Sequence, residues 1–146
     1  MKDDHYYMSI ANSEAQKALD RGDYPCGCVL ILNDKIISKA SSEGVTKKDV
    51  TLHAEIIAIR ESQKKLGTSS LDKCILYTSI EPCLMCAKAI VYAKIKKVVY
   101  GTEHKEYGDK KTFDILKQNG IGKDIKVTSG IDKEKASSLL KLFLHR

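Results

Sequence analysis

The sequence predicts an α/β fold in which a central, mostly parallel sheet is covered by helices on both faces. Segments with apolar residues at helical spacing alternate along the chain with short runs rich in β-branched residues. The connections between the later strands are long enough to hold a helix, as parallel strands require. A chain of 146 residues without linkers or repeats is expected to form a single domain over residues 1–146.

The first part of the chain is expected to form a helix followed by a hairpin. Tyr6–Asp20 places apolar or small side chains three and four positions apart, and Gly22 ends this helix. Two apolar runs, Cys28–Leu32 and Lys35–Ser38, flank Asn33-Asp34, whose residue types tolerate the positive φ of a tight turn. We therefore expect the two runs to pair as antiparallel strands.

The rest of the chain alternates between helix and strand. A helix is expected over Asp49–Leu66 with Asp49 or Thr51 as its N-cap, and this places His53 in its first turn. Pro82 suits the first position of a later helix, because it has no N–H to leave unpaired. The remaining expected elements are strands at Cys74–Thr78, Lys97–Gly101 and Ile125–Thr128 and helices at Pro82–Tyr92, Phe113–Gln118 and Lys133–Leu144.

Composition indicates a soluble protein of the cytoplasm. No apolar run approaches the ~18 residues that cross a bilayer, and the polar segment Met1–His5 leads into no signal core, so neither a membrane nor secretion is expected. Five cysteines, two of them in a C-x-x-C pair, favour metal binding over disulfides. The net charge of +6 permits attraction to nucleic acid, although the lysines are spread along the whole chain.

Two short motifs carry the residue types of a catalytic zinc site. His53, Cys83 and Cys86 offer the nitrogen and thiolate ligands that Zn²⁺ favours, and three protein ligands leave a fourth position for water. A structural site needs a fourth protein ligand, which neither motif supplies. We therefore expect one Zn²⁺ per chain, with the unliganded Glu55 taking a proton from the water and returning it to a ring nitrogen and a leaving amine.

The spacing of these residues restricts where the metal lies. Residues two apart on a helix point roughly 200° from each other, so His53 and Glu55 can share a site only if the metal lies just beyond the helix N-terminus. Cys83 and Cys86, three apart, share one face of the next helix. The backbone N–H groups at that helix start favour thiolates.

At these residues the chain resembles the cytidine deaminase superfamily, in the branch with bacterial tRNA adenosine deaminases, guanine deaminases and fungal-type cytosine deaminases. The resemblance runs from Tyr24–Cys28 through His53–Glu55 and Tyr77–Cys86 to the terminal helix. It implies a three-layer α/β/α sandwich with a five-stranded mixed, mostly parallel sheet, and a homodimer or higher oligomer. It also implies that His53, Cys83 and Cys86 bind the zinc and that Glu55 is the proton shuttle.

The resemblance further implies residues that contact the substrate. The backbone amides of Ala54 and Cys83 are implied as contacts to the substrate or the zinc water. Many family members carry a base-binding Asn eleven residues before the zinc histidine, and Ser42, with its shorter reach, stands there in this chain. His104 and Tyr107 lie in the loop where the family shapes its pocket, unless this loop is only exposed to solvent.

Cys26 and Cys28 are two residues apart at the start of an expected strand. Such positions are more often occupied by buried small apolar side chains than by metal ligands. Either cysteine could still line the base pocket, and Cys28 is kept as a candidate.

Three functions follow as hypotheses. The leading one is a zinc-dependent hydrolytic deaminase that releases ammonia from the exocyclic amine of a free nucleobase or nucleoside. The alternative is deamination of adenosine at the wobble position of a tRNA anticodon loop, which requires the base to be flipped out of its stack. The third, from another class, is a non-catalytic zinc protein that binds nucleic acid, and the unliganded Glu55 argues against it.

Overall fold

The computed structural model describes residues 2–146, and Met1 lies outside them. The strands are β1 (Gly27–Leu32), β2 (Lys35–Ser41), β3 (Ile75–Ile80), β4 (Lys97–Thr102) and β5 (Lys126–Thr128). The helices are α1 (Asp4–Arg21), α2 (Ala54–Leu66), α3 (Leu84–Tyr92), α4 (Thr112–Gln118) and α5 (Lys133–Leu144). The expected order of helices and strands is therefore confirmed. No helix in this part of the chain has both the length and the apolar character needed to span a membrane.

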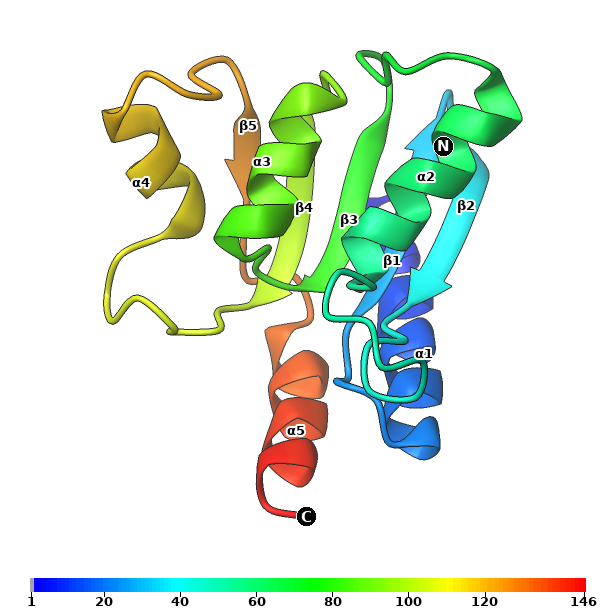
Figure 1. The fold of residues 1–146 in the computed structure, drawn as a ribbon, viewed down its shortest axis with the longest axis vertical. Helices are drawn as coiled ribbons and strands as arrows, with labels where there is room; N and C mark the ends of the chain where they lie inside the picture. Colours follow the sequence, from blue (N-terminus) through cyan, green and yellow to red (C-terminus); the bar gives the residue numbers. More distant parts are fainter. Residues whose placement is uncertain (1) are drawn as a thin grey trace.

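The five strands form one sheet in the order β2-β1-β3-β4-β5 (Figure 1). β1 pairs antiparallel with β2 and with β3, whereas β3 with β4 and β4 with β5 pair parallel. Within residues 2–146, β1 is therefore the one strand that runs against the other four. This arrangement confirms the expected mixed, mostly parallel sheet.

Each face of the sheet carries its own apolar layer. Along β1, Cys28 and Leu30 pack in the layer beneath α2, α3 and α4, whereas Val29 and Ile31 pack against α1. Figure 1 shows α2 and α3 in front of the sheet and α1 behind it. α5 packs beside α1 and against β4. The three-layer α/β/α sandwich is confirmed.

α1 lies unusually close to β1 because Gly27 has no side chain. A Cβ at Gly27 would stand 1.9 Å from the carbonyl oxygen of Ala11 and 2.4 Å from the backbone nitrogen of Ala15. Ala11 and Ala15 are themselves completely buried. Small residues on both sides of this contact therefore set the distance between helix and sheet.

The β1–β2 hairpin turns where the sequence predicts it. Asn33 and Asp34 both adopt positive φ, at 51° and 62°, which is the backbone conformation that a two-residue turn requires. β2 continues to Ser41, three residues beyond the expected end. Its longer course brings the end of β2 next to the start of β1, where Gly27 pairs with Ser41.

The start predicted for α2 was wrong, because this helix begins at Ala54 and not at Asp49. Asp49 Oδ1 accepts hydrogen bonds from the N–H and the hydroxyl of Thr51, at 2.9 and 2.6 Å, and such local turns compete with helix formation. His53 has an extended backbone (φ −73°, ψ 152°) and is the N-cap, so it precedes the first turn. Its carbonyl accepts the first helical hydrogen bond, from Ile57 N–H at 3.1 Å.

The start predicted for α3 was also wrong, because Pro82 lies outside the helix. Cys83, with φ −71° and ψ 173°, is the N-cap, and the helix begins at Leu84. The N–H of Leu84 donates to the hydroxyl of Tyr107 at 3.2 Å, and the carbonyl of Cys83 accepts from Ala87 N–H at 2.8 Å. α2 and α3 thus both start directly after a candidate metal ligand.

Candidate functional site

His53, Cys83 and Cys86 come together where α2 and α3 begin. The candidate donor atoms of these three residues all lie within 4.8 Å of one another. His53 Nδ1 is 3.5 Å from Cys83 Sγ and 3.3 Å from Cys86 Sγ. A tetrahedral zinc with ordinary bond lengths separates a nitrogen and a sulfur ligand by about 3.5 Å. The geometry and chemistry of this donor set therefore fit a zinc ion held by three protein ligands.

The contact between the two cysteines shifts their pKa values in opposite directions. A hydrogen bond from the Cys86 thiol, aided by His53, lowers the pKa of Cys83 to about 4 in spite of burial. The same contact raises the pKa of Cys86 above its ordinary value. The hydrogen bond to Cys83 raises the pKa of His53. The lowered pKa favours the thiolate form of Cys83, which is the form that binds metal.

Glu55 lies in the first turn of α2, beside this donor group. Its side chain is buried, with 3% of the residue exposed, and burial raises its pKa to about 7. The Cys26 thiol donates to Glu55 Oε1 at 3.7 Å, and the same sulfur lies 3.5 Å from Thr78 Oγ1. A carboxyl group with a pKa near neutrality can both accept and return a proton.

His53, Cys83 and Glu55 open onto a cavity of about 520 Å³. Small-molecule sites span about 300–1,000 Å³, so the cavity can admit a base. Its walls come from four places in the chain: the segment before β1, the loop after β2, the end of β3 and the loop after β4. Further lining residues from these segments include Tyr24, Cys26, Ser42, Glu81, His104 and Glu106.

The structure places some of the candidate substrate contacts in this cavity and others outside it. Ser42 and His104 line the cavity. Cys28 is completely buried in β1, opposite Thr78, and Ala54 is completely buried at the start of α2. Tyr107 packs edge-on against His104, with ring centroids 5.1 Å apart, and is not among the lining residues. The roles proposed for these residues stay predictions.

Sequence reasoning missed Glu81, which lines the cavity at the end of β3. Its Oε2 accepts from Thr112 N–H at 2.8 Å, and its Oε1 lies 3.7 Å from His104 Nε2. His104 Nδ1 accepts from Glu106 N–H at 2.8 Å, which leaves the ring proton on Nε2, 3.0 Å from Thr112 Oγ1. Glu81 thus connects the segment that carries the cysteines to the loop after β4. In the sequence, its position directly before Pro82 and Cys83 was the one signal that could have indicated a role in the site.

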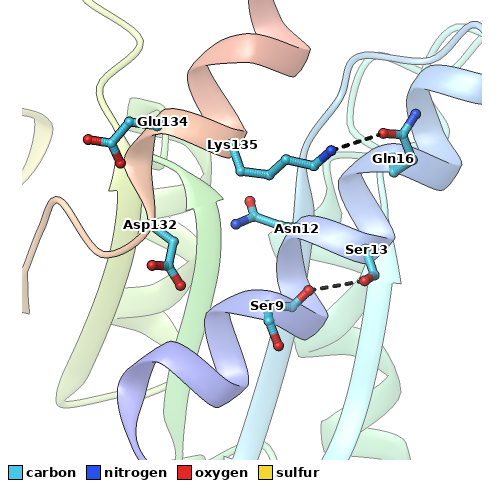
Figure 2. A pocket seen from close by; sticks show the side chains of 7 residues that line it. All are labelled: Ser9, Asn12, Ser13, Gln16, Asp132, Glu134 and Lys135. Atoms are coloured by element: carbon cyan, nitrogen blue, oxygen red, sulfur yellow. Dashed lines mark hydrogen bonds between the residues drawn. The ribbon is translucent and has the colours of Figure 1, made fainter.

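A second hollow lies on the other side of the sheet, between α1 and α5 (Figure 2). It measures about 550 Å³. Its lining residues are Ser9, Asn12, Ser13, Gln16, Asp132, Glu134 and Lys135. They include neither the histidine nor the cysteine donors of the group described above, and Lys135 donates to Gln16 at a long 3.5 Å. His53, Glu55 and Cys83 therefore line the first cavity and not the second.

Comparisons with known proteins agree with this arrangement. A family model described as the cytidine and deoxycytidylate deaminase zinc-binding region matches residues 1–102. The chain is 35% identical to a tRNA-specific adenosine deaminase of Aquifex aeolicus (strain VF5), over 97% of this chain and 93% of the relative.

Two solved structures share the fold at substantial sequence identity. One comes from a study of A-to-I editing by tRNA:A34 deaminases at the wobble position of transfer RNA. It has a TM-score of 0.86 and 32% identity, over 92% of this chain and 99% of that chain. The other is guanine deaminase from Bacillus subtilis, with a TM-score of 0.69 and 37% identity over 78% of this chain and 75% of that chain.

Proposed function

The chain belongs to the family of the cytidine and deoxycytidylate deaminases with their zinc-binding region, and from this premise we propose that it deaminates adenosine to inosine at the wobble position of tRNA. Family membership makes the chain a zinc-binding hydrolase that acts on the C–N bonds of cyclic amidines. The main support for tRNA as the substrate is the nearly full-length similarity to a tRNA-specific adenosine deaminase. It favours the alternative expectation over the leading one, a free base or nucleoside.

We assign the metal to His53, Cys83 and Cys86, whose donor atoms converge. Zinc bound there supplies a Lewis acid that activates water for attack on the ring carbon. Hydrolysis forms a C6–O bond, breaks the C6–N bond and releases ammonia. Glu55 takes one proton from the water and delivers it to N1 of the ring, and it then carries the second proton, from the new hydroxyl on C6, to the departing exocyclic amine. Proton transfer of this kind is worth about 10²–10⁴-fold in rate.

A nucleotide substrate agrees with the shape and charge of the protein. The target base must leave its stack to reach the metal, and the cavity of about 520 Å³ has room for it. The net charge of +6 favours a polyanionic partner. Membership of a deaminase family, together with the buried Glu55 beside the metal donors, argues against the third hypothesis, a non-catalytic zinc protein. The single domain, the homodimer and the cytoplasmic location stay predictions.

Guanine deamination is the second candidate. Similarity to the B. subtilis guanine deaminase, at comparable identity over a shorter part of the chain, favours it. The two candidates differ in substrate size and in product. One assay therefore separates them: ammonia release from guanine, cytosine, adenine and adenosine, beside inosine formation in a tRNA with adenosine at the wobble position.

The proposed function is tested by that assay with wild type and Glu55→Ala. We expect inosine in the tRNA, little ammonia from the small substrates, and a loss of about 10² or more in turnover for Glu55→Ala. Zinc content and fold should be unchanged, since Glu55 is not among the three clustered donors.

Glu61→Ala, on the exposed side of α2, is the matched control and should keep full activity. Ammonia release from guanine without inosine in tRNA would reject the tRNA substrate. Turnover that survives Glu55→Ala would reject the role of Glu55.

A further inference from the structure

The loop between β2 and α2 forms one wall of the cavity without any helix or strand of its own. Besides His53, five of its residues line the cavity: Ser42, Gly44, Val45, Val50 and Leu52. The loop is closed on itself by hydrogen bonds from Glu43 N–H to Leu52 O and from Asp49 N–H to Gly44 O, both 3.0 Å. A wall built in this way needs an external anchor to hold it against the sheet.

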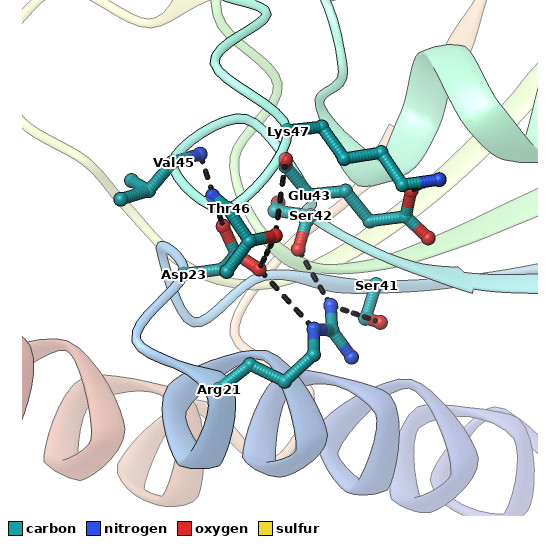
Figure 3. A network of polar contacts seen from close by, with 8 residues as sticks. All are labelled: Arg21, Asp23, Ser41, Ser42, Glu43, Val45, Thr46 and Lys47. Atoms are coloured by element: carbon teal, nitrogen blue, oxygen red, sulfur yellow. Dashed lines mark hydrogen bonds and ion pairs between the residues drawn. The ribbon is translucent and has the colours of Figure 1, made fainter.

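Asp23, just after α1, is that anchor (Figure 3). Its side chain is completely buried. Oδ1 accepts from the N–H groups of Val45 and Thr46, each at 2.9 Å, and Oδ2 accepts from the Thr46 hydroxyl at 2.8 Å and from Arg21 Nε at 3.2 Å. Burial alone would raise the pKa of Asp23, but these hydrogen bonds lower it. The carboxylate is therefore ionised and occupied by four donors, three of them from the loop wall.

Arg21 extends this anchor to Ser42. Its Nη2 donates to the Ser42 carbonyl at 2.7 Å and to Ser41 Oγ at 2.9 Å. Ser42 N–H donates to Cys26 O at 3.1 Å. Both backbone groups of Ser42 are thus held in place, while across residues 2–146 we find no hydrogen bond of its hydroxyl. Ser42 lines the cavity, where its hydroxyl is available to a polar atom of a base.

We propose that Arg21 and Asp23 are positioning residues, which hold Ser42 and the 43–52 wall in the arrangement that receives the substrate base. Neither residue lines the cavity, so both act through the loop. A wall that is ordered beforehand adds no ordering cost when the substrate binds. If the anchor is lost, the substrate must order the wall itself, and KM rises while the chemical step at the metal is unchanged. The inference rests on the proposed function only in requiring a base-containing substrate.

The test compares Asp23→Asn, Arg21→Lys and Thr46→Val in the zinc-loaded full chain. Each removes part of the anchor, and we expect KM to rise about tenfold or more, with kcat within about twofold of wild type and zinc content unchanged. Thr46→Ser, which keeps the hydroxyl, should restore the wild-type KM. Arg21→Lys and Thr46→Val change side chains at the edge of the network, so they keep the test valid if Asp23→Asn fails to fold.

Asp20→Asn is the matched control, because it makes the same change as Asp23→Asn on the exposed end of α1, outside the loop and the cavity, and leaves Asp23 untouched. Its KM should stay within about twofold of wild type. A KM that is unchanged in Arg21→Lys and Thr46→Val, or a fall in kcat together with loss of zinc, would overturn the positioning role.

Hydrogen exchange gives a readout that does not depend on the substrate. The amides of Val45 and Thr46 should exchange slowly in wild type and faster in Asp23→Asn, Arg21→Lys and Thr46→Val, because their acceptor is disturbed. If wild type acts on guanine rather than on tRNA, the proposed substrate fails, and the same KM comparison is made with guanine. Unchanged exchange would overturn the anchor itself, whichever substrate is used.

Discussion

At the scale of single residues, the metal centre could be predicted and most of the pocket could not. His53, Cys83 and Cys86 have residue types that are specific to metal sites, so their types and spacing, together with the family resemblance, predicted them as one group, and their donor atoms do lie together. Asp23 and Glu81 carry no such signal. Their importance arises from contacts with segments 22 to 31 residues away, which no local pattern records.

Zinc binding should depend on Cys86 and be coupled to stability. Cys86→Ser is expected to lose zinc and to unfold at a lower temperature, since a ligand that binds only the folded state adds about 4 kcal/mol when it is present at 1,000 times its Kd. Elemental analysis and melting curves with and without a chelator measure both effects.

Cys74→Ser is the control for this experiment, because Cys74 is buried but lies outside the donor group. It should lose some stability, keep its zinc and remain sensitive to the chelator. Equal melting temperatures of wild type with and without chelator would contradict the coupling.

At the scale of elements, periodicity predicted the helices, but their N-termini were placed too early. Asp49 and Pro82 are ordinary start signals, yet the chain begins α2 and α3 later, with His53 and Cys83 as N-caps. N-cap side chains usually accept a backbone hydrogen bond worth about 1 kcal/mol, and neither His53 nor Cys83 does so. Under the proposed ligand assignment, metal binding takes the place of side-chain capping at both helix starts, which would explain why the general capping rules failed here.

The contact between α1 and β1 should be highly sensitive to the size of the side chain at position 27. Gly27→Ala is expected to destabilise the protein by about 3 kcal/mol or more, because the new Cβ would stand 1.9 Å from the carbonyl oxygen of Ala11, a backbone atom of the helix. Urea unfolding measures the change.

Gly44→Ala is the matched control, since its Cβ would meet its nearest atom, Asp49 O, at 3.1 Å in a loop. It should cost clearly less than Gly27→Ala. Equal stability of Gly27→Ala and wild type would show that α1 can move away from the sheet without loss.

At the scale of the whole molecule, the alternation of helices and strands along the sequence was enough to predict the layered fold and the directions of most strands. The Asn33-Asp34 turn predicted that β1 reverses relative to β2. The position of β1 between β2 and β3 was not predictable, because it pairs residues such as Cys28 and Thr78 that lie far apart in sequence. Nor did any pattern indicate that α1 and α5 share a face (Figure 2).

The overall charge should make the reaction with tRNA sensitive to salt. Raising KCl from about 50 to 200 mM should lower kcat/KM for tRNA by an order of magnitude or more if a few phosphates are contacted. The value for an uncharged nucleoside, where it can be measured, should hardly change. Activity on tRNA that is independent of salt would contradict a role for the +6 charge.

The placement of the metal donors on two helix starts has a mechanical consequence. Under the proposed ligand assignment, the ion joins positions 33 residues apart and closes α2, β3 and the turns between them into a ring. Stretched out, that ring holds about 110 Å of chain. When the two ends of the zinc-bound protein are pulled apart, the force passes through the ion and not through the chain of the ring. The central strand β3 therefore bears no pulling force along its own backbone until a coordination bond breaks.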